Sequence, residues 1–121
     1  MEKPLLLLSG ALLTACAAAH ASSSYVSAYD LHSQWQAEQR LASSTASTAD
    51  GIDANRYTAY VSGVVDALDG ASICIPDGVK LGQLVAMVGK YLDDHPDQWN
   101  QAASTQVLLS LWPRFPCAKK H

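Results

Sequence analysis

The sequence predicts an all-α protein, a small four-helix domain with one disulfide. Apolar residues recur every three or four positions in four separate segments, which is the period of an amphipathic helix. No alternating run of β-branched residues is long enough for a strand. Once the N-terminal segment is set aside, two cysteines remain, Cys74 and Cys117, and two cysteines allow one pairing.

Residues 1–21 are typical of a secretory signal peptide. Lys3 precedes an apolar stretch from about Leu5 to Ala15, and the A-x-A pattern "AHA" ends at Ala21. The stretch is too short to span a bilayer as a helix. Cleavage after Ala21 would leave residues 22–121 as a single helical domain in the periplasm. "LTAC" also fits a lipobox, so a lipoprotein anchored to the membrane at Cys16 is the alternative.

Export bears on the two remaining cysteines, because exported compartments oxidise thiols. The sequence therefore predicts a disulfide between Cys74 and Cys117. A catalytic Cys117 with His121 as its base is a weaker reading, since the tail "AKKH" holds nothing to orient a base. The histidines beyond the signal are scattered along the chain and do not have the spacing of zinc ligands. No metal site is predicted.

The first predicted helix runs from about Tyr25 to Ala42, and a polar linker follows it. One face of this helix carries Ala28, Leu31, Trp35 and Ala42. The linker "SSTASTADGID" contains a turn signal at Asp50-Gly51.

The second predicted helix begins near Asp53, a plausible N-cap. Gly63 lies inside this helix and costs about 1 kcal/mol relative to alanine, which suggests a close neighbour there. Gly70 fits the position that ends a helix. The apolar stripe of the helix consists of Tyr57, Tyr60, Val61, Val64 and Leu68.

Two further helices follow a turn at Pro76-Asp77-Gly78. The third helix is predicted from Leu81 to about Asp94, and Pro96 cannot continue it. The fourth is predicted from about Asp97 to Leu111, before Pro113 and Pro116. The third helix turns Leu81, Leu84, Val85, Val88, Tyr91 and Leu92 inward. The fourth turns Trp99, Ala103, Val107, Leu108 and Leu111 inward.

Charge and motifs argue against several classes of function. The net charge of −3 gives no basic footprint for nucleic acid or for a membrane surface. The chain has no G-x-S-x-G motif, no glycine-rich phosphate loop and no H-E-x-x-H motif. The sequence therefore predicts a protein that is not an enzyme and needs no cofactor. The acid pairs Asp66/Asp69 and Asp93/Asp94 are interpreted as solvated helix residues.

Several motifs together resemble the Rap/Tai family of immunity proteins. They are "YVSGVVDAL", "CIPDGVKLGQLVAMVGKYLDDHPD" and "FPC", and they lie between Tyr57 and Cys117. The resemblance implies a small all-helical periplasmic protein, usually a homodimer. Many relatives carry an additional cysteine pair, which "DLHSQW" and "ANRYTAY" lack. We therefore expect the first helix to be attached by packing through Trp35.

The resemblance also implies a function. Such a protein binds a peptidoglycan amidase effector of a type VI secretion system and blocks its active-site cleft. The alternative is a periplasmic helical stress chaperone, which would act by exposing apolar surface at low pH.

Two rigid segments are candidates for contacting a partner. One is the turn at Pro76 and Asp77, held by Cys74. The other is the corner between the third and fourth helices, which we prefer because acids at a helix C-terminus oppose the helix dipole. A basic partner would relieve that opposition. The corner contributes Asp93, Asp94, His95, Pro96, Asp97 and Gln98.

Overall fold

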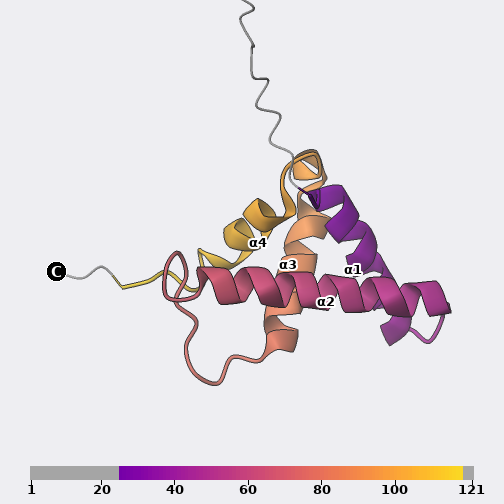
Figure 1. The fold of residues 1–121 in the computed structure, drawn as a ribbon, viewed down its shortest axis with the longest axis horizontal. Coiled ribbons are helices and arrows are strands. Elements are labelled where there is room, and N and C mark those ends of the chain that lie inside the picture. The colour runs from indigo at the N-terminus through magenta and orange to yellow at the C-terminus, as the bar shows by residue number, and fades with distance from the viewer. Residues whose placement is uncertain (1–24, 119–121) are drawn as a thin grey trace, which may run out of the picture.

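The computed structural model describes residues 25–118, and these form four α-helices with no strand (Figure 1). The predicted all-α class is thereby confirmed. Helix α2 lies across the molecule and contacts the other three helices (Figure 1). None of the helices in this part of the chain is long and apolar enough to cross a membrane. The elements are α1 (Ala28–Ala42), α2 (Thr48–Leu68), α3 (Leu81–Asp94), the 3-10 helix η1 (Pro96–Gln98) and α4 (Ala103–Leu111).

Helix α1 begins at Ala28, three residues later than predicted, because Ser27 caps it. The Ser27 hydroxyl accepts a hydrogen bond from the Asp30 amide, and the Asp30 carboxylate accepts one from the Ser27 amide. This reciprocal capping box satisfies two amides that a helix start leaves without partners. The predicted apolar face is buried, except that Ala42 is exposed at the end of the helix.

Helix α2 begins at Thr48, so the predicted turn at Asp50-Gly51 and the predicted start near Asp53 are wrong. Ser47 and Asp50 form a second capping box. Asp50 also accepts hydrogen bonds from Nε and Nη2 of Arg40, at 2.9 and 2.6 Å. Two hydrogen bonds lower the pKa of Asp50 to about 2, and the one from Arg40 has a larger effect than the one from the Ser47 amide. This arrangement fixes the α1–α2 connection, and Gly51 lies inside the helix.

Helix α2 ends as predicted, and the predicted disulfide joins the segment behind it to the C-terminus. Gly70 has a φ of +78°, a left-handed conformation that glycine adopts without a steric penalty. Cys74 and Cys117 are disulfide-bonded, and the Cys74 amide donates to the Phe115 carbonyl at 2.8 Å.

The proposed close neighbour of Gly63 is absent within the described residues. A Cβ atom built at Gly63 would meet no atom within 4 Å. The glycine that does carry a close contact is Gly89 in α3, where a Cβ atom would lie 2.3 Å from the Trp35 ring. Trp35 thus seats α1 directly against the backbone of α3, which confirms the packing expected of it.

Helix α3 has its predicted bounds, but the predicted fourth helix is broken in two. The segment between η1 and α4, residues 99–102, is not helical. Ala102 is extended and forms a bridge with Ser27. The Ala28 amide donates to the Gln101 carbonyl and the Ala103 amide to the Val26 carbonyl. These backbone contacts with the start of α1 replace the helical hydrogen bonds that one continuous helix from Asp97 to Leu111 would make.

The core is formed by side chains from all four helices together with Ile73. The Tyr57 hydroxyl donates to the Val85 carbonyl at 2.7 Å inside it. The pKa of Tyr57 is raised mainly by burial and, to a smaller extent, by the negative charges of Asp93 and Glu38. The largest fully buried apolar side chains are Tyr57, Leu31, Ile73, Leu92, Leu111, Val61, Val88 and Val107.

Candidate functional site

The preferred candidate surface is the corner between α3 and α4, and hydrogen bonds hold it from several sides. His95 ends α3, and Pro96 starts η1. Nδ1 of His95 donates to the Tyr91 carbonyl at 2.7 Å, and the two rings stack at 3.9 Å between centroids. Nε1 of Trp99 donates to the Leu92 carbonyl at 2.9 Å. The corner is therefore preorganised, with Pro96 and Asp97 exposed at its tip.

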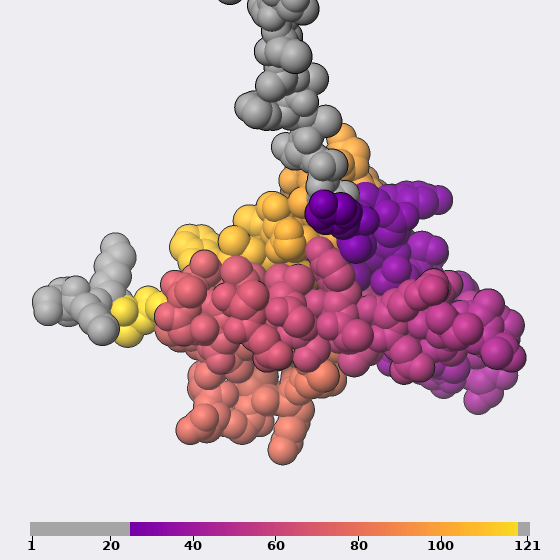
Figure 2. Space-filling model, in the orientation of Figure 1, coloured from indigo at the N-terminus to yellow at the C-terminus, as the bar shows by residue number. Residues whose placement is uncertain are grey.

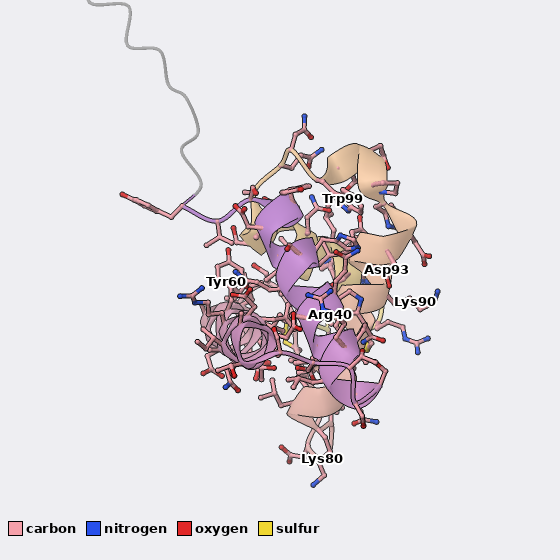
Figure 3. All side chains as sticks on the ribbon, turned by 90° about the vertical axis from the view of Figure 1, so that its right-hand side faces the viewer. Arg40, Tyr60, Lys80, Lys90, Asp93 and Trp99 are labelled. Atoms are coloured by element: carbon pink, nitrogen blue, oxygen red, sulfur yellow. A yellow bond between two sulfur atoms is a disulfide. The ribbon has the colours of Figure 1, made fainter. Side chains whose placement is uncertain are left out.

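Asp93 joins this corner to α1. Its carboxylate accepts a hydrogen bond from Nε2 of His32 at 2.9 Å and another from Nε1 of Trp35 at 3.0 Å. The His32 side chain is buried and stacks on Trp99 with 4.1 Å between ring centroids. Figure 3 shows Asp93 and Trp99 in the upper part of the molecule, beside α1. The Asp93 carboxylate, whose side chain is 49% exposed, thus already accepts two hydrogen bonds from within the protein.

The other polar residues of the corner have different roles. Asp94 forms an exposed ion pair with Lys90 at 3.1 Å. The amide oxygen of Gln98 accepts a hydrogen bond from the Tyr91 hydroxyl at 3.3 Å. Asp97 is exposed in the first turn of η1, and it is the acid of the corner best placed to meet another protein.

The second candidate surface is the turn that follows the disulfide. Gly78 has a φ of +93°, and the Val79 amide donates to the Pro76 carbonyl, as the turn predicted there requires. The Ile75 amide donates to Oδ1 of Asp69. Pro76 and Asp77 are exposed, in a segment that projects from the body of the molecule (Figures 1 and 2).

The structure separates the two candidate surfaces. They lie at opposite ends of α3, whose length is about 21 Å at 1.5 Å per residue. Figure 3 shows Lys80, which precedes α3, at the lower end and Trp99 at the upper end. Pro76 and Asp77 therefore do not join the residues 93–98 in one compact site.

Three open grooves were not found from the sequence, because each depends on how the helices pack. One, of about 390 Å³, lies between α3 and the segment from Ser110 to Arg114. The other two, of about 490 and 450 Å³, follow α2 and share Ala59 and Tyr60. His32 was also missed as a buried residue, although it directly follows the core residue Leu31. No cluster of three or more potential metal ligands occurs within residues 25–118.

Comparison with known proteins places the chain in a family. The model of the family described as Rap1a immunity proteins matches residues 9–117. No curated protein and no solved structure gave a match. The matched range includes all four helices, the disulfide cysteines Cys74 and Cys117 and the corner at residues 93–98. The chain belongs to the family of Rap1a immunity proteins.

Proposed function

We propose that this protein binds a peptidoglycan amidase effector of a type VI secretion system in the periplasm and blocks its active-site cleft. Membership of an immunity family implies binding of a cognate effector. The choice of an amidase rests on the resemblance of residues 57–117 to the Rap/Tai proteins. The structural observation that carries a blocking role is the preorganised corner at residues 93–98.

A blocking segment must keep its shape when it enters a cleft. Ordering a flexible segment on binding costs about 0.5–1.5 kcal/mol for each immobilised side chain. The corner avoids much of this cost, because Tyr91, His95 and Trp99 already hold its backbone. Its exposed tip, Pro96 and Asp97, is therefore the part we expect to approach the cleft.

Export to the periplasm is part of the same proposal. Two features support it: the signal-like sequence of residues 1–21, which lie outside the described part of the chain, and the disulfide, which suits an oxidising compartment. We expect processing after Ala21. A lipidated Cys16 recovered in the membrane fraction would show that the alternative, a tethered inhibitor, is correct.

In this proposal the protein acts as a homodimer, and α2 offers a surface for it. The two grooves along α2 are largely apolar and meet at Ala59 and Tyr60. Small residues recur every four positions as Ala59, Gly63 and Ala67, which would let a second helix approach closely. Val64→Glu places a charge in this surface, and we expect it to lower the mass measured by sedimentation. An unchanged mass for a folded Val64→Glu variant would exclude this surface.

The test of the effector assignment is stoichiometric inhibition. The type VI amidases encoded in the same genome are purified, and hydrolysis of peptidoglycan is followed as the protein is added. We expect one amidase to lose its activity at an equimolar amount. Failure to inhibit any of them, together with protection of an unrelated protein from aggregation at low pH, would support the chaperone alternative.

A further inference from the structure

The groove between α3 and the end of α4 combines an apolar floor with a cationic rim. Ala86 and Met87 form the apolar part, and Tyr91 adds its ring. Lys90, Asp94 and Arg114 are the charged residues that line it. Its volume is about 390 Å³, and it is open to solvent. The groove can therefore receive a large apolar side chain.

The charged residues around this groove give it a net positive charge, whereas the chain as a whole is negatively charged. Lys90 is paired with Asp94 at 3.1 Å, and both side chains are mostly exposed. Arg114 is exposed, and among the described residues no ion pair is formed by it. Two cations and one acid leave a net charge of about +1 at the rim at neutral pH.

The described chain beyond the corner carries no negative charge. From Gln98 to Ala118 it has no acidic residue, and it carries Arg114. The rest of the protein is acidic, since the chain as a whole has a net charge of −3. A partner with a carboxylate is therefore attracted to the groove side and repelled by most of the remaining surface.

From this arrangement we infer that the α3–α4 groove is the anchoring site for the effector. The group it receives is an apolar side chain of the effector that lies next to a carboxylate. The apolar side chain covers Met87 and Ala86, and the carboxylate pairs with Arg114. The inference rests on the proposed function, and it adds a second contact beside the corner, because Asp94 belongs to both surfaces.

The test uses the full chain and catalytically inactive variants of the amidases of the same genome. Arg114→Glu reverses the charge of the rim, and Ala86→Trp fills the groove from an exposed position. Matched controls are Lys80→Glu, at the opposite end of α3, and Ala42→Trp, at the exposed end of α1. Circular dichroism and thermal melting establish that each variant is folded.

Binding is measured by calorimetry, and contact at the groove by NMR of methionine methyl groups. The chain contains two methionines, Met1 and Met87, so Met87→Leu assigns the groove signal. We expect each groove variant to weaken binding by about tenfold or more, as the loss of an interface anchor does, and the controls by less than about twofold. The Met87 signal should shift when the amidase is added to the wild-type protein.

The outcomes separate the two proposals. An amidase that binds wild type and both groove variants equally, without moving the Met87 signal, overturns the groove assignment and leaves the effector function standing. If Lys80→Glu is then the variant that weakens binding, the Pro76 turn is the contact. If no amidase binds the wild-type protein, the proposed function fails and the groove loses its assigned occupant.

Discussion

At the scale of single residues, the contact between Trp35 and Gly89 determines how α1 sits on α3. The indole ring occupies the space that a side chain at position 89 would fill. Glycine is unfavourable inside a helix by about 1 kcal/mol relative to alanine, so its presence at this buried position is explained by the ring. The single missing Cβ atom allows a large aromatic side chain to lie in the core.

We predict that Gly89→Ala destabilises the protein although alanine is the better helix former. The new Cβ atom would lie 2.3 Å from the ring of Trp35, and such overpacking costs about 1–3 kcal/mol. Gly82→Ala is the matched control in the same helix, because its Cβ atom would meet nothing within 4 Å. Urea denaturation should show a loss of stability for position 89 and a gain, or no change, for position 82. Equal changes at the two positions would contradict this account.

Asp93 was interpreted from the sequence as a solvated helix residue, but in the structure it also forms hydrogen bonds within the protein. Its carboxylate accepts hydrogen bonds from His32 and Trp35 of α1. We predict that Asp93→Ala costs about 1–2 kcal/mol, because two buried donors lose their partner, while the half-exposed position of Asp93 lets water replace part of the loss. Asp94→Ala removes an exposed ion pair instead, which is worth about 0–1 kcal/mol.

The comparison of Asp93 with Asp94 also affects how binding experiments are designed. A charge reversal at Asp93 would disturb the attachment of α1, so a loss of effector binding could reflect altered folding. Asp97→Lys changes an exposed charge of the same corner without breaking a known internal contact. Thermal melting of the three variants would show the difference. If Asp93→Ala is as stable as the wild-type protein, the hydrogen bonds of Asp93 with His32 and Trp35 contribute little to stability.

At the scale of elements, local signals explain the parts of the fold that the sequence predicted well. Helix α3 lies between a Pro-Asp-Gly turn and Pro96, and both of its ends were predicted correctly. The start of α2 was missed, although Ser47 and Asp50 form a recognisable capping pattern, because Asp50-Gly51 was interpreted as a turn. The break before α4 had no local signal, since it depends on pairing with residues 26–28. The grooves were missed for the same reason, because they combine side chains from separate helices.

The start of α2 also has a predicted pH dependence. The pKa of Asp50 is about 2 in the folded protein and about 3.9 in an unfolded chain. A lowered folded-state pKa contributes stability that is present above about pH 3.9 and is lost as the pH falls toward 2. We predict that the melting temperature of the wild-type protein falls more steeply between pH 4 and 2 than that of Asp50→Asn. Parallel profiles for the two proteins would show that Arg40 and Asp50 do not stabilise the helix start.

At the scale of the whole molecule, the disulfide closes a loop that contains every candidate surface for contact with the effector. Cys74 follows α2 and Cys117 follows α4, with a sequence separation of 43 residues. The loop includes the Pro76 turn, α3, the corner at residues 93–98 and the groove beside Arg114. Helices α1 and α2 lie outside the loop and pack against it.

We predict that the paired variant Cys74→Ser with Cys117→Ser is less stable than the wild-type protein by about 2–5 kcal/mol. The main reason is that the crosslink restricts the unfolded chain, and a loop of this length corresponds to about 4 kcal/mol in the chain-entropy model. Denaturation of the wild-type protein with and without a reducing agent provides the control. The reducing agent should lower wild-type stability to that of the variant and should leave the variant unchanged. If the variant and the oxidised wild-type protein unfold at the same denaturant concentration, the crosslink does not stabilise the fold, and packing around Trp35 and Tyr57 must account for its stability.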